Sequence, residues 1–411
     1  MNLIFNIAWT HVRTRARQTL IAGFGVATGV GFSIMMASLM EGSQDDFVKT
    51  LVNVLPHVTV SDERNKPTLQ PAEVRYAAAE IHGLTPEVRR RGIKNPMASI
   101  AALEAWVPGK LTPSVTSKGL LRYAGRDVAV SITGIDPRTE GKVSNLETQM
   151  RQGDLSALYR ATNAIILGDR LADKLAAKVG ANVTISGSRN VRINGTVVGT
   201  FHSGVRQVDE GAAYVLIKTG QILEGQTGLV NEMRARLNDP MVARAVAARI
   251  AAETGYKSVS WEEAQEDLLS AFQVRNIIMF TVVGAILLVA SFGTYNIIST
   301  ITHEKSRDIA IMKSLGLNER TVRRIFVIEA MAIGLAGALV GSVLGYFMCL
   351  GLGTIEIKTP FIDATRLPLK YTINHYVIAA GVALFSSVIA GYFPARKAAR
   401  VHPVEIIRGA T

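Results

Sequence analysis

Residues 303–324 read HEKSRDIAIMKSLGLNERTVRR, and this charged segment lies between two long apolar runs. The run before it, 277–302, has no charged side chain, and the run after it, 325–355, has only Glu329. Each run exceeds the roughly 20 residues that a helix needs to cross a bilayer. The segment is basic, with Lys305, Arg307, Lys313, Arg320, Arg323 and Arg324. Because basic connections stay on the cytoplasmic side, we expect a cytoplasmic connection between two spans.

The segment itself predicts a short amphipathic helix. At about 100° per residue, one face gathers its large apolar residues, Ile309, Ile311, Met312 and Leu315. Asp308 lies within the same arc, Lys313 lies opposite, and Gly316 supplies a helix stop. So short a helix is marginal alone and needs a surface for its apolar face. That surface is either the lipid interface or a groove on a partner protein.

Composition places the chain in the membrane class. Its 411 residues are 48% hydrophobic, with a mean hydropathy of +0.23. The net charge of +12 does not indicate a nucleic-acid partner, because many basic residues flank apolar runs as membrane topology requires. The one cysteine, Cys349, lies in an apolar run, so an exported domain has to fold without an intramolecular disulfide.

The other runs complete the topology. Residues 20–40 form 21 uncharged positions, longer than the core of a cleavable signal peptide. The last apolar run ends at Pro394, which we expect to stop its helix. The predicted segments are an interfacial amphipathic helix at 1–19, transmembrane helix 1 at 20–41, a periplasmic domain at 42–271, transmembrane helix 2 at 272–302, the cytoplasmic coupling helix at 303–324, transmembrane helix 3 at 325–355, a periplasmic loop at 356–374, transmembrane helix 4 at 375–394 and a cytoplasmic tail at 395–411.

The fold class is therefore an integral membrane protein with four transmembrane α-helices, in a 1+3 arrangement around a large α+β periplasmic domain. Both termini are expected in the cytoplasm. Alternating residues in the polar region predict strands at 57–61, 128–133, 182–186, 191–201, 213–217 and 231–237. Helical patterns occur at 73–81, 169–179, 240–254 and 261–275. The last of these predicts a helix that continues unbroken into the second span.

Glycines and one acidic residue are candidate packing or functional positions in the spans. The first span contains Gly25 and Gly29, and the third contains Gly337, Gly341 and Gly345. Glycines four residues apart permit close helix contacts, although glycine is also simply common in membrane helices. Glu329 is a functional candidate by its depth in the third span. We favour the alternative that it snorkels to the interface or pairs with Arg323 or Arg324.

Signatures of catalysis are missing from the sequence. It has no G-x-x-x-x-G-K-[ST], H-E-x-x-H, C-x-x-C or G-x-S-x-G stretch, and its seven histidines are scattered. An enzyme therefore has no positive support. Transport, signalling and scaffolding remain as classes.

Three stretches resemble the MacB/FtsX-type ABC transporter permeases, the type VII or mechanotransmission class. They are EKSRDIAIMKSLG at 304–316, the glycine-bearing run at 325–345 and PARKAARVHPVEIIR at 394–408. The resemblance implies a permease dimer that binds two copies of a separate ATPase subunit. ATP and Mg would be bound by that partner, and no cofactor by this chain. It also implies a coupling role for Glu304, Arg307, Asp308, Ile309, Ile311, Met312, Leu315 and Gly316.

A narrower resemblance, to the LolC/LolE lipoprotein-releasing branch, is carried by VVGTFHSGVRQVDEGAAYVLI at 197–217 and by shorter stretches at 237–240, 260–261 and 296–302. It implies a bacterial inner-membrane protein that extracts a lipoprotein or another amphipathic substrate from the outer leaflet. A substrate cavity would lie between first and second spans of opposing protomers. Its candidate lining, which is also ordinary membrane-helix composition, is Phe32, Met35, Met36, Met279 and Val283.

Two other functions stay open for this family. One is an efflux permease that docks to a membrane-fusion protein, and the other is FtsX-like signalling to a periplasmic cell-wall hydrolase. Besides membrane lipids, a periplasmic lipoprotein carrier is a further candidate partner. The dimer is either homomeric or heteromeric.

Overall fold

The computed structural model describes residues 16–64, 75, 92–187, 191–225, 227–314, 316–355 and 366–400. The chain forms two compact units. Unit 1 comprises Met1–Asp46, Ala271–Ile357 and Thr365–Thr411, and unit 2 comprises Phe47–Ser270 and Lys358–Ala364. Several predicted features lie wholly or largely outside the described residues: the helix at 1–19, the helix at 73–81, most of the loop at 356–374, the tail from 401 and Leu315.

The long helices are α2 Ala16–Val54, α11 Glu266–Glu304, α13 Glu319–Leu352 and α14 Ile373–Ala399, with the short α12 Ser306–Ser314 between α11 and α13. All four long helices are long and apolar enough to cross a membrane. They extend past the apolar runs because apolar residues continue at helical spacing among the neighbouring polar residues. In α2, for example, Phe47 and Leu51 follow the charged stretch after Met40 and are both buried.

Two expected helix ends are wrong. α14 does not stop at Pro394 but continues to Ala399, with Pro394 buried inside it. A proline inside a membrane helix is tolerated where neighbouring helices satisfy the freed backbone groups. The helix at Trp261 is also not continuous with the second span. It ends at Ala264, Gln265 departs from helical geometry (φ −118°, ψ 23°), and α11 begins at the next residue.

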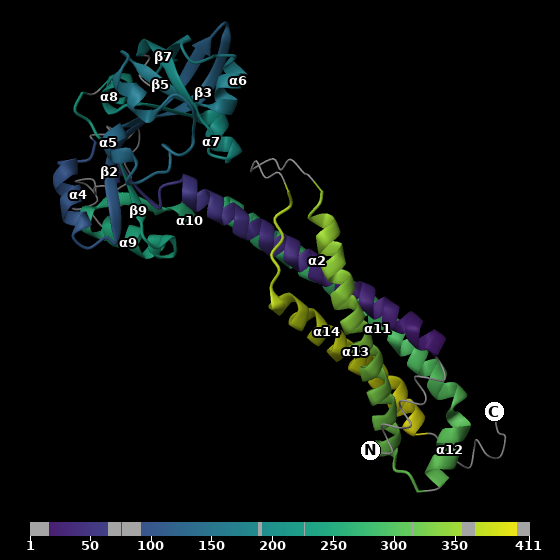
Figure 1. The fold of residues 1–411 in the computed structure, drawn as a ribbon. Coiled ribbons are helices and arrows are strands. Elements are labelled where there is room, and N and C mark those ends of the chain that lie inside the picture. Colours follow the sequence, from purple (N-terminus) through teal and green to yellow (C-terminus); the bar gives the residue numbers. More distant parts are fainter. Residues whose placement is uncertain are drawn as a thin grey trace. The chain divides into compact units, whose positions relative to one another are not determined.

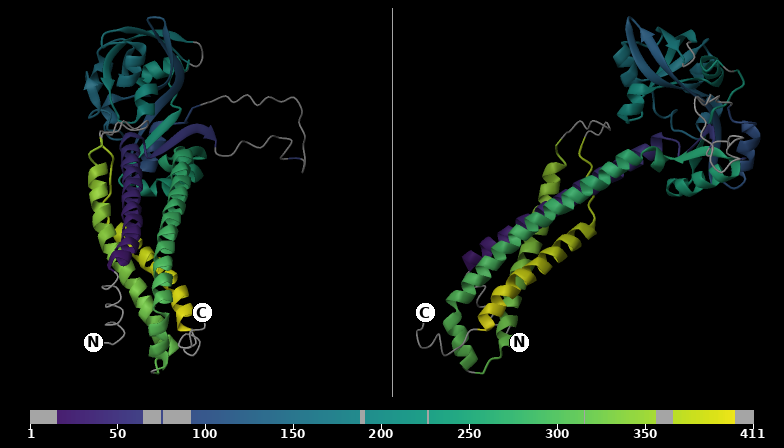
Figure 2. Two further views of the ribbon diagram at one scale, coloured as in Figure 1. Left: turned by 90° about the vertical axis from the view of Figure 1, so that its right-hand side faces the viewer. Right: turned by 180° about the vertical axis from the view of Figure 1, so that it is seen from behind.

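In unit 1, α2 lies between α11 and α13 (Figure 2). Near one end, small and branched residues of α11, α12, α13 and α14 form a common core with α2. Its buried members are Ala22, Ile298, Ile301, Ile309, Val322, Phe326, Ala330, Ile333, Ala395, Ala398 and Ala399. Further along, α2 packs on α14 through Val26, Val30, Ile34, Ala379 and Ala383. By comparison α11 is exposed, with 11% of its most apolar stretch buried.

Unit 2 is an α+β domain with a ten-stranded sheet (Figure 1). The strands are β1 Val58–Arg64, β2 Gly109–Tyr123, β3 Arg126–Ile135, β4 Met150–Gln152, β5 Ala164–Gly168, β6 Asn182–Ser186, β7 Arg192–Phe201, β8 Ala212–Leu216, β9 Glu232–Leu237 and β10 Tyr256–Ser260. The helical elements are α4 Pro96–Glu104, α5 Pro137–Glu140, η1 Leu155–Tyr159, α6 Asp169–Leu175, α7 Arg206–Gly211, α8 Ile217–Leu223, η2 Pro240–Val242, α9 Ala243–Thr254 and α10 Trp261–Ala264.

The strand order is β10-β1-β9-β2-β3-β8-β5-β7-β4, with β6 pairing with β2 and β7. β2 belongs to both halves of the sheet, because residues 109–114 pair with β9 and residues 115–123 pair with β3. Each half has its own core. The first half packs on α4 and α9, and the second is built around β5, β8 and α6. The six strands predicted from alternation are confirmed as β1, β3, β6, β7, β8 and β9.

A buried ion pair ties α5 to β9. The Arg234 guanidinium donates to both carboxylate oxygens of Glu140, at 2.6 and 3.1 Å, and to Ser114 Oγ at 3.1 Å. Glu140 is 1% exposed and Arg234 5% exposed. The pair is bidentate, which is the geometry that offsets the cost of burying two charges.

His57 ties the end of α2 to β9 inside the first half of the sheet. The Leu237 N–H donates to Nδ1 at 3.0 Å, so Nδ1 carries no proton. Nε2 lies 3.1 Å from the Val52 carbonyl and must carry the proton that it donates there. The ring is 2% exposed. Burial, and to a lesser extent the charge of Arg236, lowers the pKa of His57, because the charged imidazolium loses its hydration there; the hydrogen bond to the Val52 carbonyl partly opposes this shift.

This arrangement predicts acid sensitivity of unit 2. A lowered folded-state pKa means that the unfolded chain binds the proton more readily, so the contribution to stability is present above the unfolded pKa of about 6.5 and is lost as pH falls through the folded pKa. We expect the unfolding midpoint followed by tryptophan fluorescence to fall by a few degrees between pH 7.5 and 5.5. His57→Asn, which keeps an acceptor without titrating, should reduce this pH dependence. His303→Asn, at an exposed histidine, should leave it unchanged.

Candidate coupling interface

The segment that the sequence singled out forms a helix and a tight turn. α11 ends at Glu304, and the Ile309 N–H donates to the Lys305 carbonyl at 2.9 Å, so α12 follows almost directly. Gly316 has φ +95°, a left-handed value that glycine adopts without strain. Asn318 is extended, and α13 starts after it at Glu319. Residues 319–324, expected in the connection, therefore belong to the third long helix.

The inner face of α12 is covered by its own chain. Ile309 and Ala310 are both 0% exposed. Ile309 belongs to the core that contains Val322 and Phe326 of α13. The hypothesis that Ile309 inserts into a partner is therefore wrong, because a side chain already buried in its own core offers no surface to another protein.

The outer face of α12 is mixed in character. Arg307, Asp308 and Ile311 are exposed, and so is Glu304 at the end of α11. Ile311 is 46% exposed, so it presents apolar surface on this face. Lys305 forms an ion pair with Asp308 at 2.7 Å. The side chain of Met312 lies outside the described residues. These four exposed residues are called the outer face below.

Lys313, expected on a solvated far face, instead contacts the end of α14. Its Nζ donates to the Ala399 carbonyl at 2.8 Å and lies 3.5 Å from a Glu319 carboxylate oxygen. A cation at the last carbonyls of a helix is favourable, because these groups have no partner within the helix. Lys313 thus links α12 to α14 and is not an inert control position.

Glu329 is 0% exposed and lies within α13. Snorkelling to the interface, one of the two interpretations that we favoured from the sequence, is therefore wrong, whereas pairing with Arg323 or Arg324 stays a prediction. A carboxyl group held inside a bundle remains a candidate for a functional role.

The glycines of α13 pack directly against α2. A Cβ added to Gly337 would lie 2.7 Å from Val26 Cβ, and one added to Gly341 would lie 2.6 Å from the Ala27 carbonyl oxygen. A Cβ on Gly345 would lie 3.0 Å from Ile34 Cβ. These distances leave no room for a side chain, so the backbones of α2 and α13 are in contact along this face.

In α2, the glycines that lie close to a neighbouring helix are Gly29 and Gly31, whereas the sequence singled out Gly25 and Gly29. No described atom of this chain lies within 4 Å of a Cβ added to Gly25, so Gly25 has no close helix contact among the described residues, and its role in packing stays a prediction. A Cβ on Gly29 would meet Leu287 of α11 at 3.3 Å. Gly31, which the sequence analysis did not single out, faces α13, where an added Cβ would lie 3.2 Å from the Gly341 carbonyl oxygen.

The candidate cavity residues are all partly covered within unit 1. Intermediate burial is shared by Phe32, Met35, Met36, Met279 and Val283. The more exposed apolar side chains of α11 lie at other positions, such as Ile278, Phe280 and Val289. A cavity lining based on α11 would therefore include these residues.

A polar cluster that the sequence did not predict joins α2 to Lys370, before α14, and to His375, in the first turn of α14. Lys370 Nζ lies 2.8 Å from Glu41 Oε1 and 2.7 Å from Asp45 Oδ2, and His375 Nε2 lies 2.5 Å from Glu41 Oε2. The hydrogen bonds to Asp45 and Glu41 raise the pKa of Lys370. Gly42 permits this contact, since an added Cβ would lie 2.3 Å from the Pro368 carbonyl oxygen.

Reversing the central charge of this cluster should loosen the contact. Lys370→Glu replaces two ion pairs by repulsion among three carboxylates, and we expect a thermal midpoint lower by a few degrees in low salt. The double variant Lys370→Glu/Glu41→Lys should recover part of that loss. Because the groups are partly exposed, the difference should shrink in about 0.5 M salt, where the Debye length is below 8 Å. Equal midpoints for the wild type and Lys370→Glu would show that these pairs stabilise nothing.

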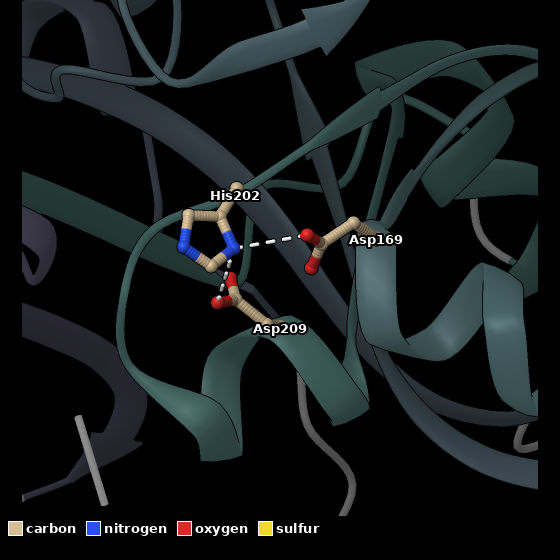
Figure 3. Close-up of side chains that lie close together, drawn as sticks. All are labelled: Asp169, His202 and Asp209. Carbon is tan, nitrogen blue, oxygen red and sulfur yellow. Dashed lines mark ion pairs between the residues drawn. The ribbon is translucent and has the colours of Figure 1, made fainter. Parts of the chain in front are cut away.

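Unit 2 brings together one group of side chains that could hold a metal ion, Asp169, His202 and Asp209 (Figure 3). His202 Nδ1 lies 2.9 Å from Asp169 Oδ2 and 3.3 Å from Asp209 Oδ2. Imidazole and carboxylate are suitable zinc ligands. However, Asp209 is fully buried and already accepts hydrogen bonds from Ser203 and Gly204.

The hydrogen bonds of Asp209 explain the cluster without an ion. Ser203 donates through both its N–H and its hydroxyl, each at 2.7 Å, which closes the turn between β7 and α7. Burial raises the pKa of Asp209, partly opposed by these bonds and by His202. This turn is the HSGVRQVD part of the stretch 197–217, and we assign the cluster a structural role in it.

Comparison with known proteins covers both units. The family profile of the MacB-like periplasmic core domain matches residues 19–253, and that of the FtsX-like permease C-terminal region matches residues 280–403. The transmembrane protein LolC of the Neisseria meningitidis lipoprotein-releasing system is 29% identical, covering 95% of this chain and 94% of LolC. LolE of Haemophilus influenzae is 24% identical over 99% of both chains. The macrolide export ATP-binding/permease protein MacB of Hyphomonas neptunium is 24% identical over 97% of this chain and 59% of its own length.

Proposed function

The chain belongs to the family of membrane proteins with a MacB-like periplasmic core domain, and we propose that it is the permease subunit of an ABC transporter that releases lipoproteins or other amphipathic molecules from the outer leaflet of the bacterial inner membrane. Similarity to LolC and LolE along nearly the whole chain carries the proposal. ATP and Mg would be bound by two copies of a separate ATPase subunit. A second permease protomer, identical or not, completes the membrane part.

In the proposed mechanism, closure of the ATPase subunits moves the outer face of α12. Ile309 and Lys313 fix α12 to α13 and α14, so a force on the outer face reaches these helices without first bending a loop. α2 would follow α13, because their backbones are in contact at the glycines. The substrate would contact the exposed apolar side chains of α11.

The transport proposal is tested with the chain and its ATPase subunit in proteoliposomes that contain a triacylated lipoprotein. We expect ATP to move the lipoprotein into the soluble fraction, and a non-hydrolysable ATP analogue not to do so. ATP-dependent movement of a macrolide without lipoprotein release would instead support the export function named for MacB. Absence of both activities, with ATPase binding intact, would favour the signalling function.

The topology is tested by cysteine labelling in a Cys349→Ser background. Lys178→Cys, at an exposed position of unit 2, should react with a membrane-impermeant maleimide in intact spheroplasts. Asn318→Cys, exposed between α12 and α13, should react only after the membrane is opened. The reverse pattern would overturn the predicted orientation.

A further inference from the structure

A recess of about 400 Å³ in the first half of the sheet of unit 2 is lined by six basic or amide side chains and three apolar ones. It lies where α2 ends, beside the turn that follows β9. The lining residues are Val52, Asn53, His57, Lys110, Lys142, Arg236, Leu237, Asn238 and Pro240. Three of them are cations and none is a carboxylate, so the lining itself carries a net positive charge.

The recess differs in this respect from the paired cations elsewhere in unit 2. Many of its other cations lie beside an acid, as in Arg122–Asp127 at 2.5 Å, Lys174–Glu210 at 2.7 Å and Arg249–Glu253 at 3.3 Å. Among the described cations of the recess, only Lys110 has an acidic neighbour: its Nζ lies 3.8 Å from Glu104 Oε2. Among the described residues, neither Lys142 nor Arg236 forms an ion pair.

The end of α2 does not account for the charge. A helix C-terminus carries about half a negative charge, which cannot balance three cations. Its last carbonyls are also partly occupied, since Leu51 accepts from the Leu55 N–H and Val52 accepts from His57. The field of Arg236 reaches the floor of the recess, where it adds to the effect of burial in lowering the pKa of His57.

We propose that this recess binds a phosphate group, supplied either as inorganic phosphate or as the phosphodiester of a lipid headgroup. The planar guanidinium of Arg236 can donate two parallel hydrogen bonds to phosphate oxygens, while the lysines act as point charges. The amides of Asn53 and Asn238 add neutral donors. Three cations and two amides suit the several oxygens of a phosphate better than the two oxygens of a carboxylate. The site is independent of the substrate that the protein transports.

The test uses the full chain in detergent, in a chloride buffer of low ionic strength, with ¹³C-labelled histidine followed by NMR. Inorganic phosphate is titrated, and the His57 signal is assigned from the His57→Asn variant. We expect a saturable shift of the His57 signal, because a bound anion changes the field at the floor of the recess. The His202 signal, from the other half of the sheet, should not move.

Variants separate a specific site from general attraction to a basic protein. Lys142→Gln and Arg236→Gln should each weaken phosphate binding about tenfold, the effect of losing one charge-assisted hydrogen bond. Lys178→Gln removes one exposed positive charge elsewhere on unit 2 and should leave the affinity unchanged. Lys142 is exposed, so its variant keeps the fold even if Arg236→Gln, on β9, does not.

A parallel titration with dihexanoyl-phosphatidylglycerol identifies the source of the phosphate. Saturation by this diester with the same variant dependence assigns the site to a lipid headgroup, and saturation by inorganic phosphate alone assigns it to the free ion. Three results would overturn the proposal: no saturable shift with either probe, an equal response of Lys178→Gln and Lys142→Gln, or a glutamate-rich peptide that binds where neither phosphate does.

Discussion

Replacing Ile311 with aspartate is expected to abolish ATP-driven release by the reconstituted transporter while the permease stays folded. Ile311 is 46% exposed on the outer face of α12, so a charge there remains accessible to solvent. Burial of a large aliphatic side chain in a partner contributes roughly 1.5–3 kcal/mol. Losing this contact should weaken binding of the ATPase subunit to each α12 helix by at least about tenfold.

The matched controls separate coupling from folding. Asn318→Asp adds the same charge at an exposed position of the same connection and should keep full activity. Ile309→Asp buries a charge in the core shared with Val322 and Phe326, so it should lower the thermal midpoint sharply. The two readouts are stimulation of the ATPase subunit and the unfolding midpoint of the permease. Full ATPase stimulation by the Ile311→Asp variant would show that α12 merely lies on lipid.

Asp308 provides a finer test of the same interface. It is exposed beside Ile311 and pairs with Lys305 within the chain. If the partner groove presents a basic group, Asp308→Lys should reduce ATPase stimulation more than Asp308→Ala, because the reversal adds repulsion to the lost attraction. Similar losses in both variants would place no basic group opposite Asp308.

The amphipathic pattern of 303–324 predicted the existence of the helix but only part of its environment. Periodicity tells which residues share an arc, and Ile309 and Ile311 do share a broad one. It cannot tell which neighbour covers each edge of that arc. α13 and α14 cover Ile309 and leave Ile311 exposed, and this depends on contacts with residues such as Ala395 that are far away in sequence.

The number of long apolar helices was also predictable, because bilayer thickness sets a length that few soluble helices reach. Their ends were not. Pro394 stays inside α14 where that helix is packed against α13, and a Cβ added to Gly391 would lie 2.3 Å from Ala330 Cβ. The neighbouring helix α13 supports Pro394 within α14, and the sequence around Pro394 carries no sign of that contact.

In unit 2, alternation located six of the ten strands, whereas β2, β4, β5 and β10 were missed. In β5 all five residues, Ala164–Gly168, are buried, so the strand has no polar face to alternate. The basic recess, the Glu41 cluster and the Arg234–Glu140 pair were also missed. Each of these sites brings together side chains that are far apart in sequence, and the sequence around a single residue does not show which distant residues it will contact.

Replacing Gly341 with leucine is expected to have the largest effect on stability of the changes in the long helices. A Cβ at this position would lie 2.6 Å from the Ala27 carbonyl oxygen, 2.7 Å from Val30 Cβ and 3.0 Å from Ala27 Cα. Two of these atoms belong to the backbone of α2, so no change of rotamer relieves the clash. α2 and α13 would have to separate, and we expect a loss of about 3 kcal/mol or more, at the upper end of the range for overpacking.

The control is Gly351→Leu in the same helix, where no described atom lies within 4 Å of an added Cβ. Both variants gain the same side chain and the same helix propensity, so their difference isolates the contact with α2. Adding Val30→Ala to Gly341→Leu should not restore stability, because alanine keeps its Cβ and the Ala27 carbonyl does not move. The measurements are the monodisperse yield in detergent and the thermal midpoint. Equal midpoints for the two leucine variants would mean that α2 and α13 are not in backbone contact and that the glycines of α13 reflect membrane-helix composition alone.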